Sequence, residues 1–177
     1  IIYAEEELVN DSQSPPERPI DDDWLYKWKE NASKVSTEEL QQLWGKILAG
    51  EVKSPGKYSL RTIEFLKNIS QEEARFIELV AQFIISGCIA RDENGIFEKN
   101  GITFGKLLLL QELGIVVGVE AIGMSMEFKS DVLGSFQKIL VSSNKALLLL
   151  HEDSSKKLSL RSYGLSSLGK QIVSLGT

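Results

Sequence analysis

Residues 36–50 read STEELQQLWGKILAG, and this stretch decides the first half of the fold. Ser36 is placed to cap a helix, and Glu39 can return a hydrogen bond to the cap. Gly50 is suited to end the helix in a left-handed turn. The apolar positions between them follow the spacing of one helix face: Leu40, Leu43, Trp44, Ile47 and Leu48. The stretch therefore predicts an amphipathic helix whose Leu and Trp face builds a core.

Further helices are predicted on both sides of this stretch. Residues 22–34 place Trp24, Leu25 and Trp28 at helical spacing. Ser59 opens another helix after a turn at Pro55-Gly56. Ser70 then begins a longer helix, whose apolar positions continue as far as Ile85. The first half of the chain is therefore predicted to be helical.

The pattern changes in the second half, where short strands alternate with turns. Asn94-Gly95 is typical of a hairpin turn, and Thr103 can cap a helix that stops at Gly114. Ser166 is placed to cap a last short helix. Strands are predicted over residues 115–119, 124–128, 136–141, 145–150 and 157–162. The fold class is therefore α+β, a helical N-terminal half followed by a small winged-helix-like domain with antiparallel strands.

Three regions are predicted along the chain. Residues 1–20 form an acidic, Pro-rich entry segment, because residues 10–20 hold three of the four prolines. Residues 21–68 form a helical region, and residues 69–177 form the α+β winged-helix-like domain. The chain begins with Ile rather than Met, so we expect it to be a piece of a longer protein.

Charge is distributed unevenly between the front and the rest of the chain. Residues 1–39 hold 11 acidic and 4 basic side chains, whereas the remainder holds 14 acidic and 16 basic ones. A nearly neutral body lacks the general attraction to phosphate that drives nucleic-acid binding. Nucleic acid is therefore not an expected partner.

Composition excludes several classes of protein. The 177 residues are 42% hydrophobic and include one Cys, which cannot form an internal disulfide. The uncharged apolar runs are far shorter than the roughly 20 residues of a membrane-spanning helix. A lone thiol and the lack of a targeting segment favour a reducing cytoplasm. One His and one Cys do not make a structural zinc site, and no phosphate-binding loop is found, so we predict no metal and no cofactor.

Two residue groups raise the question of catalysis or metal binding. Cys88 and His151 could form a nucleophile and base if the fold brought them together. Cys88 lies in an apolar run, however, which favours a packing role. Asp21-Asp22-Asp23 could offer oxygen ligands to a cation, but acids at a helix start are favoured by the helix dipole. No catalytic residue is therefore predicted, and we expect the chain not to be an enzyme.

Two surfaces are hypotheses for binding. Trp24, Leu25 and Trp28 could present an aromatic stripe to a protein partner, including a second copy of the chain. The alternative is that this helix folds back on the Leu40–Leu48 stripe. Lys156, Lys157 and Arg161 would lie on the wing of a winged helix and contact phosphates. The alternative is that these charges protect an edge strand.

Residues 39–80 carry a resemblance to known families. The run Glu39-Leu40-x-x-Leu43-Trp44-x-x-Ile47-Leu48-Ala49-Gly50, followed by Pro55-Gly56, Ser59, Thr62, Leu66, Ser70, Glu73 and Ala74, resembles an uncharacterised family of bacterial proteins of unknown function. More loosely, it is similar to the abortive-infection alpha family of bacterial phage-defence proteins. The resemblance implies shared helical architecture and no catalytic residue.

Together these observations predict a non-enzymatic, intracellular interaction or regulatory module of a longer bacterial protein, with phage defence as one role that the resemblance implies. The alternative is a winged-helix nucleic-acid-binding domain.

Overall fold

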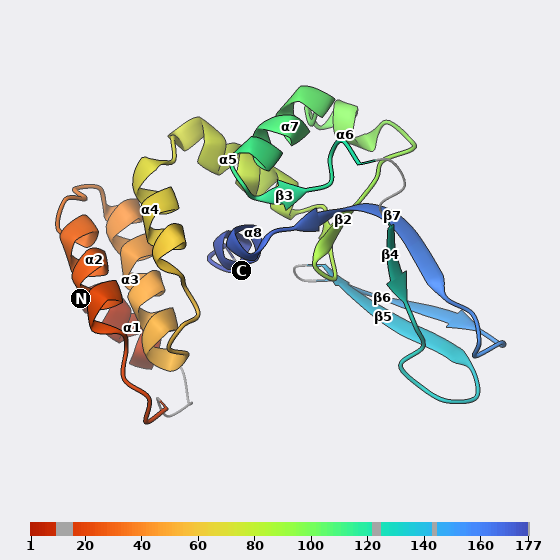
Figure 1. Ribbon diagram of the computed structural model, residues 1–177, viewed down its shortest axis with the longest axis horizontal. Coiled ribbons are helices and arrows are strands. Elements are labelled where there is room, and N and C mark those ends of the chain that lie inside the picture. The colour runs from red at the N-terminus through yellow and green to blue at the C-terminus, as the bar shows by residue number, and fades with distance from the viewer. Residues whose placement is uncertain (10–15, 122–124, 143–144, 177) are drawn as a thin grey trace. The chain divides into compact units, whose positions relative to one another are not determined.

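The computed structural model describes residues 1–9, 16–121, 125–142 and 145–176. Backbone contacts divide the chain into two compact units. The first comprises Ile1–Gln71 with Ser174–Gly176, and the second comprises Glu72–Val173. Helices dominate the N-terminal half and antiparallel strands follow, which confirms the predicted α+β class (Figure 1).

Four helices build the described part of the first unit: α1 (Ile2–Val9), α2 (Asp22–Ala32), α3 (Glu38–Lys53) and α4 (Leu60–Asn68). The Asp21 carboxylate caps α2 by accepting the Trp24 N–H at 2.9 Å. Ser59 caps α4, as predicted, whereas α3 is capped by Thr37 rather than by Ser36. Each cap satisfies a backbone N–H that has no partner within the helix.

The entry segment contains a helix that the sequence pattern did not predict. α1 packs along α3, and Ala4 is buried there. Gly45 allows this approach, because a Cβ atom at that position would lie 2.6 Å from the Cβ atom of Tyr3. The predicted linker over residues 10–20 lies partly outside the described residues.

All three tryptophans belong to the core of the first unit. Trp24, Trp28 and Trp44 are each less than 10% exposed. The indole N–H of Trp24 donates to the Tyr58 carbonyl at 2.7 Å, and that of Trp28 donates to the Trp44 carbonyl at 2.9 Å. Buried indoles need such partners, and these bonds tie α2 to α3 and to the chain before α4.

α3 continues past Gly50, so the prediction that Gly50 ends this helix was wrong. Gly50 instead makes room for the Tyr58 ring, because an added Cβ atom would lie 2.7 Å from the ring. The buried Glu51 carboxylate accepts the N–H groups of Gly56 and Tyr58, the latter at 2.9 Å. A carboxylate in the last turn of α3 therefore holds the loop that follows the helix.

The second unit is built around a five-stranded antiparallel sheet. Its helices are α5 (Gln71–Ala81), α6 (Ile96–Lys99), α7 (Phe104–Glu112) and α8 (Ser167–Val173). Its strands are β1 (Ile84–Ile85), β2 (Cys88–Ala90), β3 (Val116–Val117), β4 (Ser125–Phe128), β5 (Phe136–Ser142), β6 (Lys145–His151) and β7 (Leu158–Leu165). The sheet order is β1-β2-β7-β3, and β4 pairs with the first half of β7. β5 and β6 form a separate hairpin.

Two turns differ from the prediction. The helix that begins after Ser70 ends at Ala81, and the chain then reverses at Ser86-Gly87, where both residues have positive φ. The predicted hairpin at Asn94-Gly95 was wrong, because Gly95 leads into α6 in a left-handed conformation. Asp92 stabilises that entry by accepting the N–H groups of Phe97 and Asn94. These bonds, chiefly the one from Phe97, hold the pKa of Asp92 below its ordinary value.

The winged-helix layout is not confirmed. A wing at Lys156–Arg161 would require a hairpin beside those residues, formed by neighbouring strands. β6 pairs with β5, and β7 pairs with β2, β3 and β4. β7 is buried over Ser162–Gly164, because it crosses the middle of the larger sheet there.

Candidate protein-interaction surface

The aromatic residues proposed as a protein-binding stripe are not on the surface. Trp24 is 3% exposed and Trp28 is 7% exposed, while Leu25 is 39% exposed. Both indoles are packed and hydrogen-bonded within the first unit. The structure therefore has the alternative arrangement, in which α2 folds back on α3.

The three basic residues proposed to contact phosphate are exposed, but two of them are paired with acids. Lys157 lies 3.1 Å from Glu127 on the neighbouring strand, and Arg161 lies 3.4 Å from Glu93. Lys156 is exposed just before β7. The pairing interrupts the positive face that phosphate binding would use.

Cys88 and His151 have separate hydrogen-bond partners. The Cys88 thiol is fully buried in β2, where it donates to the Ile85 carbonyl at 3.2 Å. Burial raises the pKa of this thiol above its ordinary value, which disfavours the reactive thiolate. His151 is exposed at the end of β6, where its Nδ1 accepts the Asp153 N–H at 3.0 Å.

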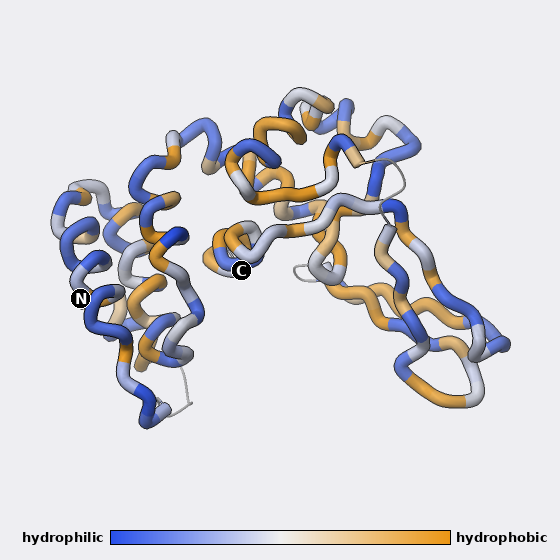
Figure 2. The backbone as a smooth tube through the Cα atoms, viewed as in Figure 1, coloured by the Kyte–Doolittle hydropathy of each residue, from blue (hydrophilic) through white to orange (hydrophobic). Residues whose placement is uncertain are grey.

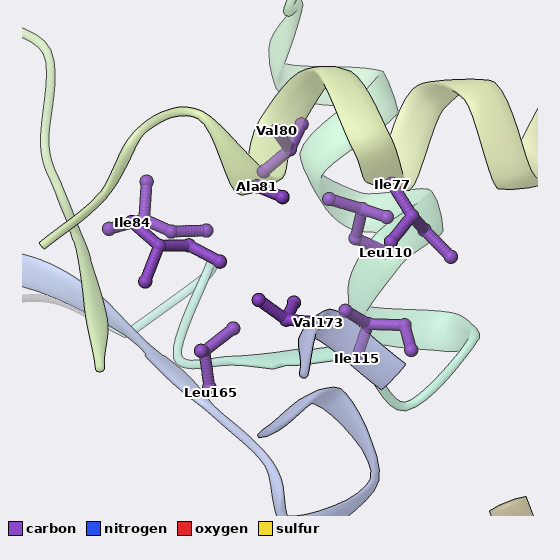
Figure 3. Close-up of a pocket in the computed structure, with 9 residues that line it drawn as sticks. Ile77, Val80, Ala81, Ile84, Leu110, Ile115, Leu165 and Val173 are labelled. Atoms are coloured by element: carbon purple, nitrogen blue, oxygen red, sulfur yellow. The ribbon is translucent and has the colours of Figure 1, made fainter. Parts of the chain in front are cut away.

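A small apolar cavity lies inside the second unit. Side chains from α5 (Ile77, Val80 and Ala81), from α7 and the residues after it, from the strands and from α8 surround it (Figure 3). Its volume of about 10 Å³ is at the lower limit for one water molecule, so it is a packing defect rather than a ligand site. Within the described ranges, no group of three or more His, Cys, Asp or Glu residues could hold a metal ion. None of the described helices combines the length and apolar character needed to cross a bilayer.

The β5–β6 hairpin carries the most distinctive surface of the second unit. Its register pairs Gln137 with Leu150, Ile139 with Leu148, and Val141 with Ala146. Because side chains alternate across a strand, these three pairs share one face. We call this the hairpin face, formed by Gln137, Ile139, Val141, Ala146, Leu148 and Leu150.

Aliphatic side chains on the hairpin face are open to solvent. Ile139 and Val141 are each 53% exposed, Leu148 is 54% exposed and Leu150 is 65% exposed. Hydrophobic stretches run along both strands in Figure 2. The opposite face holds the buried Phe136 and Leu140, which anchor the hairpin, and one exposed aliphatic side chain, Leu147.

The charged residues of the hairpin lie on that opposite face. Alternation places Lys138, Lys145 and the titratable His151 there, together with Phe136 and Leu140. The hairpin face thus contains five apolar side chains and one amide. Such a continuous uncharged patch on a protein surface is typical of an interaction site.

The outer edge of β5 is covered by other segments of the second unit. The N–H of Gln137 donates to the Ser130 hydroxyl at 3.1 Å, and the N–H of Val141 donates to the Ser86 hydroxyl at 3.0 Å. The Asp131 carboxylate accepts from Lys138 Nζ at 2.6 Å and from the Ile139 N–H at 3.3 Å. The Lys138 hydrogen bond in particular holds the pKa of Asp131 below its ordinary value. These contacts fix β5 and leave β6 as the open edge of the hairpin in the described chain.

The sequence pattern predicts both strands but not this surface. The run Ala146–Leu150 has the composition of a buried strand. Whether it is exposed depends on whether another part of the fold covers it, and the local sequence does not show this. The sequence does contain one indication of this face. Positions 137, 139 and 141 and positions 146, 148 and 150, which share a face in a paired hairpin, are all uncharged.

The fold and this surface define an α+β chain with a helical unit and a sheet unit that exposes an apolar hairpin. The family model described as "Protein of unknown function (DUF2806)" matches residues 3–95, which is more than half of the chain. The chain belongs to this uncharacterised family. The match spans α1 to β2 and ends before the hairpin. Neither the curated proteins nor the solved structures contain a match to the chain.

Proposed function

We propose that this chain is a non-enzymatic protein-interaction module that binds its partner through the hairpin face. The observation that carries the proposal is the exposure of four aliphatic side chains on one uncharged face of β5 and β6. Fully burying such a side chain contributes about 1.5–3 kcal/mol. About half of each side chain is still exposed, so a partner gains roughly 1 kcal/mol from each.

The non-enzymatic character is supported by the environment of the two residues that suggested catalysis. The Cys88 thiol is buried and bonded to a backbone carbonyl, and His151 accepts a backbone N–H on the surface. A nucleophile and its base would instead contact each other beside a substrate pocket.

The wider role in this proposal is regulatory and intracellular, in a bacterial host. The resemblance of residues 39–80 to abortive-infection alpha proteins supports phage defence as the setting. In the structure this segment supplies caps and core, such as Ser59 and the buried Trp44.

Site-specific photo-crosslinking in the native host tests the proposal. A photoreactive residue replaces Leu148 in one variant and Leu25 in a matched control, since both leucines are partly exposed. We expect protein crosslinks from position 148 and none from position 25. Absence of any protein adduct at position 148 would overturn the proposed function.

Nucleic-acid binding through Lys156, Lys157 and Arg161 is the second candidate. The exposure of all three side chains favours it, but residues 72–173 hold 11 basic and 12 acidic side chains. We therefore expect no affinity of micromolar or better for double-stranded DNA at physiological salt. Such an affinity, weakened by reversing the charge of the three residues, would promote this candidate over protein binding.

A further inference from the structure

We propose that the partner of the hairpin face is a second copy of this chain, packed face to face about a two-fold axis. The inference rests on the proposed function, because it names the occupant of the same surface. Two hairpins packed in this way form a small sandwich with about 10 Å between the layers.

The chemistry of the hairpin face suits a self-complementary contact. In a two-fold interface each patch must match itself, so a charge near the axis would meet its own copy. The hairpin face avoids this, because Lys138, Lys145 and His151 all lie on its opposite side. An uncharged apolar patch can meet a second copy without electrostatic cost.

The sizes of the side chains also suit one arrangement. With the axis perpendicular to the strands, the central pair Ile139 and Leu148 stacks on the same pair of the second copy. The same rotation sets Leu150 against Ala146 of the second copy, so a large side chain meets a small one. Alternation of large and small residues lets two layers interdigitate.

The area available on the hairpin face sets the size class of the contact. About half of the surface of four aliphatic side chains, with Ala146, amounts to roughly 400–500 Å² per copy, or about 800–1,000 Å² in total, which falls in the range of small, transient interfaces. The association is therefore weak and depends on concentration.

Sedimentation of the purified whole chain tests this inference. We expect the wild type to shift from monomer to dimer as its concentration rises. Leu148→Lys and Ile139→Lys, which set like charges against each other near the axis, should each weaken dimerisation about tenfold or more. Leu25→Lys is the matched control and should dimerise like the wild type, since Leu25 is an exposed leucine of the first unit. Circular dichroism verifies that each variant is folded.

Cysteine crosslinking gives a second readout that does not depend on a charged variant. Because the native Cys88 is fully buried, an introduced cysteine is the reactive one. Oxidation of Leu148→Cys should give a covalent dimer, and oxidation of Leu25→Cys should not.

Two results would overturn the inference: a wild-type monomer up to about 1 mM, or a dimer that both lysine variants leave intact. Crosslinks in the host from position 148 to a different protein, with a monomeric purified chain, would end this inference and leave the proposed function standing.

Discussion

Ser86 and Val141 are joined by two hydrogen bonds that connect the larger sheet to the β5–β6 hairpin. The Ser86 N–H donates to the Val141 carbonyl at 2.7 Å, and the Val141 N–H donates to the Ser86 hydroxyl at 3.0 Å. Ser86 has a φ of 47°, in the left-handed region that non-glycine residues rarely adopt. The β1–β2 turn therefore holds the edge of β5 with a backbone conformation that is unfavourable for serine by itself.

Ser86→Ala and Ser86→Gly separate the hydroxyl from the backbone conformation. Both remove the hydroxyl that accepts the Val141 N–H, and this loss should lower the free energy of unfolding by about 0.5–1.5 kcal/mol. Glycine also relieves the unfavourable φ, so Ser86→Gly should be the more stable variant in urea unfolding. Amide exchange at Val141 should be faster in both variants than in the wild type. Unchanged exchange in both would show that the hydroxyl bond does not form in solution.

Gly45→Ala should destabilise the chain, although alanine is the better helix former. The added Cβ atom would lie 2.6 Å from Tyr3 Cβ and 3.1 Å from the Ala4 nitrogen, so α1 must move away from α3. Gly105→Ala in α7 is the matched control, because its nearest contact is 4.0 Å away. In that variant the better helix propensity of alanine should raise the free energy of unfolding by up to about 1 kcal/mol. Thermal unfolding of both variants measures the contrast, and the same sign for both would refute the close packing of α1.

Trp44→Ala should lower the free energy of unfolding by about 3–5 kcal/mol, since it empties a large buried site. The ring is 3% exposed, and its backbone carbonyl accepts the Trp28 indole N–H. Leu40→Ala is the control on the same helix, and its exposed side chain should cost about 1 kcal/mol or less. Equal losses in denaturant unfolding would mean that the core face of α3 is misplaced.

The elements that local chemistry determines were predictable from the sequence. The periodicity of residues 40–48 predicted α3, and the caps at Ser59, Thr103 and Ser166 were confirmed. Leu40 and Leu43 are more exposed than the helix pattern implied, because the apolar stripe extends beyond the surface that α1 and α2 cover.

The elements that distant contacts determine were not predictable. α1 depends on Gly45, about 40 residues along the chain, and the end of β1 depends on the Ser86–Val141 contact. The pairing of β6 with β5 rather than β7 depends on how β2, β3 and β4 occupy β7. The hairpin face was missed for the same reason, since exposure is a property of the assembled fold.

Cys88 should react slowly with a thiol reagent in the folded chain at neutral pH. Its side chain is fully buried, which limits access of the reagent. Burial also raises the pKa of the thiol, so a smaller fraction is present as the reactive thiolate. Labelling should become fast after unfolding in urea. His151→Ala should leave the folded labelling rate unchanged, because His151 bonds to Asp153 instead. Fast labelling that His151→Ala abolishes would support a catalytic pair and contradict the non-enzymatic proposal.

Acid should loosen the loop that supports β5, through Asp131. The Lys138 hydrogen bond, assisted by the Ile139 N–H, holds the pKa of Asp131 below its ordinary value. A carboxyl group whose pKa is lower in the folded state stabilises the fold above its unfolded pKa, about 4, and this contribution is lost as the pH falls through the folded pKa. Asp131→Asn should therefore reduce stability at pH 7 and flatten its dependence on pH below about 4.

NMR titration of the side-chain carboxyl groups tests directly whether Lys138 lowers the pKa of Asp131. In Lys138→Met the pKa of Asp131 should rise towards its ordinary value, whereas the lowered pKa of Asp153, due first to the Ser155 hydroxyl, should not move. A pKa of Asp131 that stays low in Lys138→Met would show that Lys138 is not the cause.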